Sequence, residues 1–519
     1  MLSRFAFLLA AAAFAAASTL HASPLDLDPF TLDPGYNGGA IRLDRFGGNN
    51  GTHRDSAGQK VVRLADGSYV VAALVDAFDA ESGTITGIHN IGVMRLDSQG
   101  RKIAWPNVNS GYTDASRNYI VVPNRLNARY NAIADLQVYG NRIYVMADHF
   151  EDAAHTDVHV LAFGLDGSYH GMMGLLADEQ EHGVGLVFAE LTPGAPRMML
   201  VTSHTSSTGF STLRLARYLI DPVTEDTELD TAFGVNGYLL RAVLDCRSAS
   251  GTAGACSTLP FAVTTIGAKD DGTPRADPYI FIAGRYLQRD DTTTSSLKQR
   301  SFVLKTDIRG GFSFQYGEPN LAGSIDGVVG YDLPNTSAAN QVRDIAVRYE
   351  AGEGLVAFVL HNVSRGCGAG FNIARIDGAG LGVAAASTTP FGGSDADPCT
   401  EQARVTAEAK ALILQHDRLA IVGSQAYYFW GILPVQDAWL AIVDANHGYL
   451  TEYRMFQAKV GDDVTRGSFN DIALNGDRCL IAAGNATDIG RNERDIASVA
   501  GLCADRIFAG SFGSERYDE

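Results

Sequence analysis

A short β-rich unit recurs along this 519-residue chain, and internal repetition constrains its fold more than any other feature. The first half of the unit is a strand, a tight turn and a second strand, seen at 61–71, 135–145, 411–421 and 471–481. In the first of these copies the turn is Asp66-Gly67 between two apolar runs. Such a pair is the strongest short hairpin signal, because both turn residues must tolerate positive φ. We therefore predict a β-hairpin at each copy.

The second half of the unit is an apolar run that ends at an aspartate. Its copies are 91–97, 160–166, 215–221, 302–307, 371–377, 439–444 and 499–505. A further β-prone run follows, as at 238–240 and 450–453. About seven repeats of four short strands predict an all-β fold, a single β-propeller of about seven four-stranded blades.

The alternatives to a propeller are an array of β-sandwiches or a β-helix. An array should carry linkers, and no Pro/Ser-rich boundary separates the units. We expect one domain over 23–519. Either 40–43 or 506–508 could complete the last blade.

The first 22 residues predict a secretory signal peptide, because a basic start at Arg4 precedes an apolar run, 5–17, and small residues ending at Ala22. The apolar run is too short to span a bilayer, which needs roughly 20 residues. No later segment reads as a membrane span. The expected location is the periplasm or the medium.

Six cysteines fit an exported protein, since disulfides persist in oxidising compartments. Proximity in the sequence suggests the pairs Cys246–Cys256, Cys367–Cys399 and Cys479–Cys503.

The charge balance, 41 basic against 59 acidic residues, gives a net charge of −18. Nucleic-acid binding requires a basic footprint, so this balance argues against it. It argues equally against binding to anionic membrane surfaces.

Two segments carry a family resemblance. Asp230-Thr231-Ala232-Phe233-Gly234-Val235-Asn236-Gly237 follows the run ending at Asp221, and 32–39 is a looser echo. With the Asp-Gly hairpins, the chain resembles the bacterial delta-60 repeat of exported proteins. The resemblance is tight only around 215–237 and 61–71. It implies a β-rich repeat architecture and no catalytic residues.

The densest cluster of metal-ligand residue types lies in 148–159. Imidazoles and carboxylates are suitable donors for zinc and similar ions. The candidate ligands are His149, Glu151, His155, Asp157 and His159. Their spacing matches no established motif, and the alternative is a solvated polar loop.

The largest aromatic run is Tyr427-Tyr428-Phe429-Trp430, in a predicted loop over 425–437. Other long loops are expected at 286–299, 361–370 and 484–495. Because function concentrates on variable loops of a rigid scaffold, Tyr427, Tyr428 and Trp430 are candidate binding residues for a protein or carbohydrate. The alternative is that the run extends a strand.

Asp135, Asp344 and Asp471 share one repeat position, at the expected start of the innermost strand. A ring of carboxylates there could bind a cation. The competing interpretation, which we prefer, is that each accepts backbone N–H bonds.

No motif of a nucleophile elbow, zinc protease, phosphate loop or dinucleotide loop occurs. We therefore expect an exported, non-catalytic binding or surface-interaction scaffold. The alternative is a propeller hydrolase, lyase or oxidoreductase with a metal on the loop face. The sequence identifies no cofactor.

Overall fold

The structure is a computed structural model. It describes residues 30–44, 46, 56–78, 85–109, 113, 117–122, 129–150, 155–175, 180–207, 209–241, 257–289, 297–311, 327–333, 341–365, 368–379, 383–388, 406–429, 433–456, 459–460, 463–476, 479–488 and 493–504. Residues 1–22, predicted as a signal peptide, lie outside this part.

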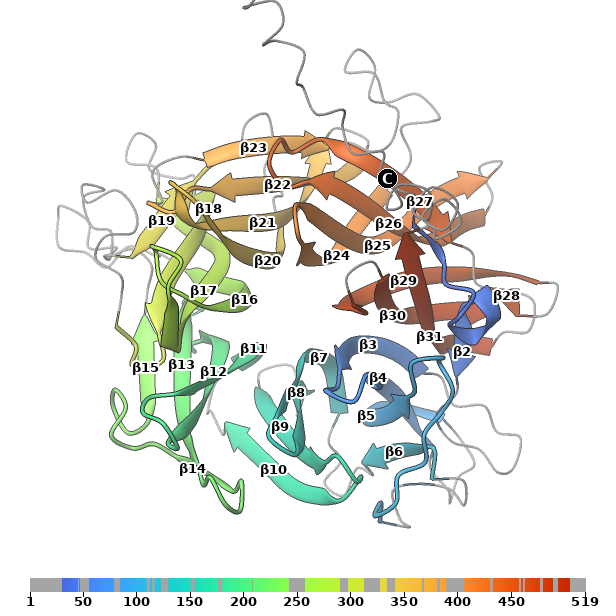
Figure 1. Ribbon diagram of the computed structural model, residues 1–519, viewed down its shortest axis with the longest axis horizontal. Coiled ribbons are helices and arrows are strands. Elements are labelled where there is room, and N and C mark those ends of the chain that lie inside the picture. Colours follow the sequence, from blue (N-terminus) through green and yellow to red (C-terminus); the bar gives the residue numbers. More distant parts are fainter. Residues whose placement is uncertain are drawn as a thin grey trace, which may run out of the picture.

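The described strands fall into successive antiparallel sets arranged around a central opening (Figure 1). The first four sets are β3 (Ser56–Arg63), β4 (Tyr69–Phe78), β5 (Ile85–Leu96) and β6 (Tyr119–Val122); β7 (Arg129–Tyr139), β8 (Arg142–Phe150), β9 (Thr156–Gly164) and β10 (Tyr169–Leu175); β11 (Gln180–Glu190), β12 (Pro196–Thr205), β13 (Ser211–Ile220), β14 (Thr227–Leu229) and β15 (Tyr238–Arg241); β16 (Thr258–Ala268), β17 (Pro274–Arg289), β18 (Leu297–Asp307) and β19 (Val328–Tyr331).

Three more sets complete the circle. They are β20 (Gln341–Glu350), β21 (Gly354–Arg365), β22 (Gly368–Ile376) and β23 (Val383–Thr388); β24 (Thr406–Gln415), β25 (Arg418–Phe429), β26 (Leu433–Asp444) and β27 (Leu450–Phe456); β29 (Asp463–Leu474), β30 (Cys479–Asp488) and β31 (Glu493–Ala504), joined by β28 (Lys459–Val460), β1 (Phe30–Leu32) and β2 (Arg42–Asp44). The fold is all-β and propeller-like, and its one described helix is a 3-10 turn at Asn37–Gly39.

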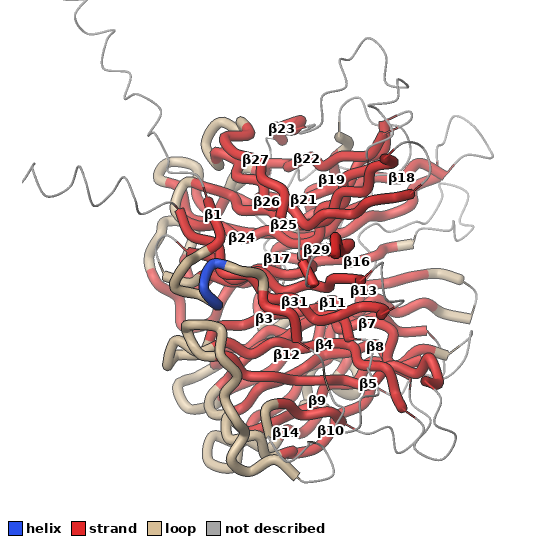
Figure 2. Tube along the Cα trace, turned by 90° about the vertical axis from the view of Figure 1, so that its right-hand side faces the viewer, coloured by secondary structure: helices blue, strands red, loops and turns tan. Residues whose placement is uncertain are grey.

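The predicted hairpins form at the inner side of each set. Gly67, Gly140 and Gly476 adopt positive φ in these turns, and His416 does so in the copy that has no glycine there. In the side view of Figure 2, many of the described turns gather along one side of the molecule.

The core lies between the sets rather than within any one of them. Each hydrophobic cluster joins two neighbouring sets: one joins the first and second, and the series continues until the last is joined back to the first. Both faces of each sheet are therefore buried, and the arrangement is circular.

The N-terminal strands close the circle. β1 and β2 both pair with β31, with Arg42 opposite Val499. Between these two strands Tyr36 is 1% exposed, and a Cβ atom added at Gly501 would lie 2.5 Å from the Cβ of Tyr36. Of the two runs considered for closure, 40–43 therefore overlaps a closing strand, and 506–508 lies outside the described residues.

The inner strands begin earlier than predicted, because each carries a β-bulge. In β7 the register shifts between Ile133 and Asp135, so the strand continues back to Arg129. Equivalent shifts occur in β3, β11, β16, β20, β24 and β29. A bulge reverses the alternation of inward-facing and outward-facing side chains. A prediction based on strict alternation therefore misses the first half of each strand.

The predicted loops are shorter than expected, because antiparallel pairing continues into them. Arg289 pairs with Leu297, Arg365 with Gly368 and Asp488 with Glu493. Backbone pairing satisfies N–H and C=O groups whatever the polarity of the side chains, so polar sequence did not mark the strand ends.

The predicted pair Cys479–Cys503 is confirmed as a disulfide between directly opposed residues of β30 and β31. The remaining four cysteines, Cys246, Cys256, Cys367 and Cys399, lie outside the described residues. No helix in the described part of the chain is long and apolar enough to cross a membrane.

Reducing Cys479–Cys503 is expected to lower the free energy of unfolding by about 2 kcal/mol. This value is at the low end for a disulfide, because the bond spans 24 residues whose ends are already paired strands. Guanidinium unfolding with and without reductant measures the change, and non-reducing peptide mapping checks the pairing. A peptide joining Cys479 to a different cysteine would contradict the predicted arrangement.

Candidate functional site

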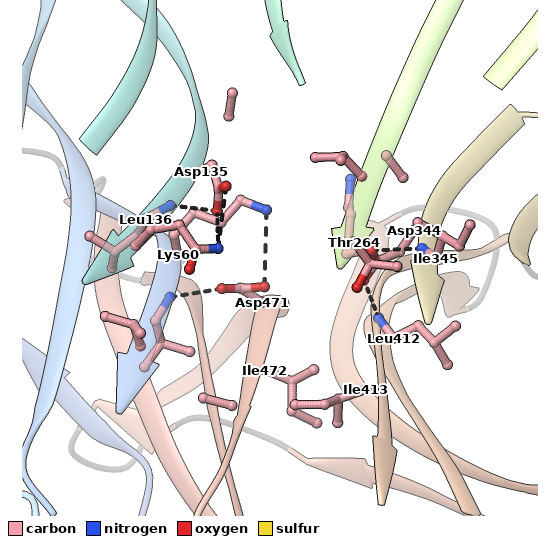
Figure 3. A pocket seen from close by; sticks show the side chains of 18 of the residues that line it. Lys60, Asp135, Leu136, Thr264, Asp344, Ile345, Leu412, Ile413, Asp471 and Ile472 are labelled. Atoms are coloured by element: carbon pink, nitrogen blue, oxygen red, sulfur yellow. Dashed lines mark hydrogen bonds and ion pairs between the residues drawn. The ribbon is translucent and has the colours of Figure 1, made fainter. Parts of the chain in front are cut away.

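The inner strands surround a cavity of about 590 Å³ (Figure 3). Its lining includes Asp135, Asp344 and Asp471, together with Lys60 and Arg343. The three aspartates occupy the same place in their sets, immediately after the bulge of the inner strand.

Each aspartate links its own set to the next one. The Asp135 carboxylate accepts the N–H of Leu136 at 2.7 Å and that of Leu186, in the next set, at 2.8 Å. Asp344 likewise accepts from Ile345 at 2.8 Å and from Leu412 at 2.7 Å.

Asp471 makes the corresponding link across the point of closure. Its carboxylate accepts the N–H of Val61 at 2.8 Å, which joins the last set to the first. The Lys60 ammonium lies 4.0 Å from the same carboxylate. The interpretation of these aspartates as backbone acceptors is therefore confirmed.

Burial in the cavity shifts the pKa values of these groups. Burial raises the pKa of Asp135 and of Asp471, and it raises the pKa of Asp344 to about 6, with Lys60 opposing the shift in each case. Burial alone would lower the pKa of Lys60, but the three carboxylates together raise it. All three carboxylates accept backbone N–H groups, and that of Asp471 also lies beside Lys60, so the three aspartates form a structural element.

A second polar cluster lies where β8 ends and β9 begins. His149, Asp157 and His159 each offer a ligand atom within 4.8 Å of those of the other two, and all three side chains are buried. The register explains the grouping. His149 lies directly opposite Asp157, and His159 follows two residues later on the same face of β9.

Tyr130 of β7 completes this cluster and was missed by the sequence reasoning. It pairs with His149 in the register, and its hydroxyl lies 3.1 Å from Nδ1 of His159. Nothing in the sequence marks Tyr130, because it precedes the bulge and lies 29 positions from its partner.

The two imidazoles stack with ring centroids 4.3 Å apart and planes 13° apart. Burial, and then the neighbouring His149, lower the pKa of His159 to about 4. His159 is therefore neutral at pH 7.

Of the five predicted metal ligands, the structure brings three together. His155, which immediately precedes β9, is described but is not part of the group. Glu151 lies outside the described residues.

The opposite face of β8 carries a separate dyad. The Asp148 carboxylate accepts the N–H of Gly183 at 2.7 Å and lies 3.0 Å from Nδ1 of His182. The hydrogen bond to Asp148 raises the pKa of His182. The adjacent residues Asp148 and His149 thus lie at two different interfaces between neighbouring sets.

The predicted aromatic loop is largely strand. Tyr427 pairs with Val435 and Tyr428 with Pro434, so both belong to the hairpin of β25 and β26. Trp430 lies outside the described residues. The assignment of this run to a loop was therefore wrong for Tyr427 and Tyr428, while its role in binding remains a prediction.

No family model matches the sequence, and a search of curated proteins found no relative. Among solved structures, the chain is similar to a protein of unknown function from Dyadobacter fermentans, at 12% identity over 90% of this chain and 100% of that one, with a TM-score of 0.38.

A sialidase from Trypanosoma rangeli in complex with sialic acid aligns at 12% identity over 90% of this chain and 57% of that one, with a TM-score of 0.36. The WD40 domain of SCAP from fission yeast aligns at 8% identity over 89% and 98% of the two chains, with a TM-score of 0.33. Likeness at this level assigns neither a family nor an activity.

Proposed function

We propose that the chain is a single seven-bladed β-propeller acting as an exported, non-catalytic binding scaffold. The blade count is supported by the repeated bulge in β3, β7, β11, β16, β20, β24 and β29. Two of the larger sheets are held together only by single parallel pairs, Gln180 with Thr156 and Ala369 with Thr406. Dividing them there gives the seven blades.

One observation carries the binding role: the tip of the hairpin formed by β25 and β26 extends past its neighbours. Among the described residues, β24 pairs with β25 only as far as Ala426, and β27 pairs with β26 only as far as Ala438. Tyr427, Tyr428 and Phe429 therefore pair only with the opposing strand of their own hairpin. Among the described residues of this blade, 427–429 and 433–435 pair only within this hairpin, and we call them its tip.

An aromatic tip suits recognition of a protein or a carbohydrate. Tyrosine and tryptophan contribute large contact areas at modest entropic cost and dominate binding hot spots. The net charge of −18 does not suit nucleic acid.

The disulfide Cys479–Cys503 supports export to the periplasm or the medium, where such bonds persist. The resemblance to delta-60 repeats agrees with an exported repeat protein.

Replacing both Tyr428 and Trp430 with alanine is expected to weaken ligand binding by at least about 2 kcal/mol, because it removes two hot-spot side chains. The melting temperature should stay nearly unchanged. The test is a glycan array probed with labelled protein spanning 23–519, followed by calorimetry on the strongest glycan.

The matched control is Tyr449→Ala, which removes a tyrosine that is 71% exposed elsewhere. Its binding and melting temperature should equal those of the unmodified protein. Unchanged glycan binding in the double variant would contradict the proposal. So would a loss of roughly 3–5 kcal/mol of stability for each ring, since that is the cost of truncating a core aromatic.

A second candidate, a propeller enzyme with a metal-assisted site, is favoured by the grouping of His149, Asp157 and His159. Catalysis would need substrate access to these buried side chains. Among the described residues, the three inner carboxylates are bonded to backbone, which favours the scaffold.

A further inference from the structure

The cluster of His149, Asp157 and His159 has the composition of a transition-metal site. Two imidazoles and one carboxylate suit zinc and its neighbours, whereas calcium and magnesium prefer oxygen ligands alone. At metal–ligand distances of about 2.1 Å, tetrahedral donors lie about 3.4 Å apart. Ligand atoms already within 4.8 Å of one another need only small side-chain rotations to reach that spacing.

We propose that His149, Asp157 and His159 bind one divalent transition-metal ion of the zinc class. The site goes beyond the scaffold function and does not depend on it. Its ligands come from two paired strands, β8 and β9, so the backbone fixes their relative positions. Three protein ligands leave a fourth position for water or for a ligand atom.

Tyr130 is positioned to hydrogen-bond to one of the metal ligands, His159. Metal-bound histidines usually hydrogen-bond through the other ring nitrogen, which fixes the ring orientation. With Nδ1 of His159 3.1 Å from the Tyr130 hydroxyl, Nε2 is the nitrogen of His159 left to face an ion. Tyr130 also contacts the His149 ring, with centroids 5.6 Å apart, so one side chain contacts both imidazoles.

The ion would lie between the first two blades. Tyr130 belongs to the same hydrophobic cluster as Ile91 of β5 and Leu161 of β9. His149, Asp157 and His159 are only 4–6% exposed, so a bound ion would be shielded from bulk water. Such an ion would link β8 to β9 close to the end of β8.

The experiment is a zinc titration of metal-stripped, folded protein spanning 23–519 by calorimetry, with stoichiometry checked by elemental analysis. We expect one zinc ion per chain. His159→Gln and Asp157→Asn should each weaken zinc affinity by at least about 100-fold, and Tyr130→Phe by about 10- to 100-fold.

The matched control is His155→Ala. His155 lies in the same segment but is not part of the cluster, so this variant should bind zinc as the unmodified protein does. Circular dichroism and the zinc-dependent rise in melting temperature show which variants are folded. If His159→Gln fails to fold, Asp157→Asn and Tyr130→Phe still decide the matter.

Three outcomes would overturn the proposal. One is the absence of stoichiometric zinc uptake by the folded protein. Another is unchanged affinity in Asp157→Asn and His159→Gln, and the third is an equal loss of affinity in His155→Ala. In each case the stacked imidazoles would be packing groups rather than ligands.

Discussion

Replacing Tyr36 with alanine is expected to lower the free energy of unfolding by about 3–5 kcal/mol, the usual cost of removing a buried aromatic ring. Tyr36 is 1% exposed and belongs to the cluster that joins the last blade to the first. Its ring fills the space left by Gly100, where an added Cβ would lie 2.8 Å from it, and its Cβ approaches Gly501. Equilibrium unfolding in guanidinium chloride measures the effect.

The exposed Tyr449 provides the control, since Tyr449→Ala should change stability by less than about 0.5 kcal/mol. A loss below about 1 kcal/mol in Tyr36→Ala would mean that the N-terminal strands do not close the circle as described. The effect reports on closure, because the hydrophobic cluster of described residues that contains Tyr36 is the one that joins the last blade to the first.

Acidification from pH 7.5 to pH 4 is expected to stabilise the unmodified protein by about 2 kcal/mol relative to Asp344→Asn. Burial raises the pKa of Asp344 to about 6 in the fold, against an ordinary value of 3.8. The folded state therefore binds the proton more tightly than the unfolded state does. Stability from this group is fully present below about pH 4 and is lost as the pH rises through about 6.

The measurement is guanidinium unfolding of both proteins at several pH values between 4 and 7.5. Asparagine cannot titrate, so the difference between the two curves reports on Asp344 together with its electrostatic coupling to Lys60 and Asp471. A difference that stays constant over this range would show that the Asp344 pKa is not raised.

Much of the fold could be predicted from the sequence, because hairpin turns and apolar runs that end at an aspartate follow one another in the same order in each repeat. The run 238–240 forms β15 and 450–453 lies within β27, as expected. The beginnings of the inner strands could not be predicted, since each bulge interrupts the alternation on which the prediction relies. Closure by β2 could be predicted only as one of two alternatives, 40–43 or 506–508, because pairing between distant parts of the chain cannot be chosen from local sequence.

The candidate site was predicted only in part, for reasons of strand geometry. Asp157 and His159 are two residues apart on one strand, so a common face could be anticipated once the strand was known. His149 joins them because of the hairpin register, which depends on where the turn falls. Tyr130 and the dyad of Asp148 and His182 require pairings with other strands, which spacing does not reveal.

Closure by β1 and β2 also sets the order in which the molecule can be completed. These strands are synthesised before all the other described strands, whereas their partner β31 is synthesised after them. Until β31 emerges, β1 and β2 lack the strand with which they pair, so their edges stay open, and the growing stack of blades keeps an uncovered apolar sheet face at each end. Open edges invite pairing with other chains, so the nascent protein passes through an aggregation-prone stage that ends only when the two ends of the chain meet.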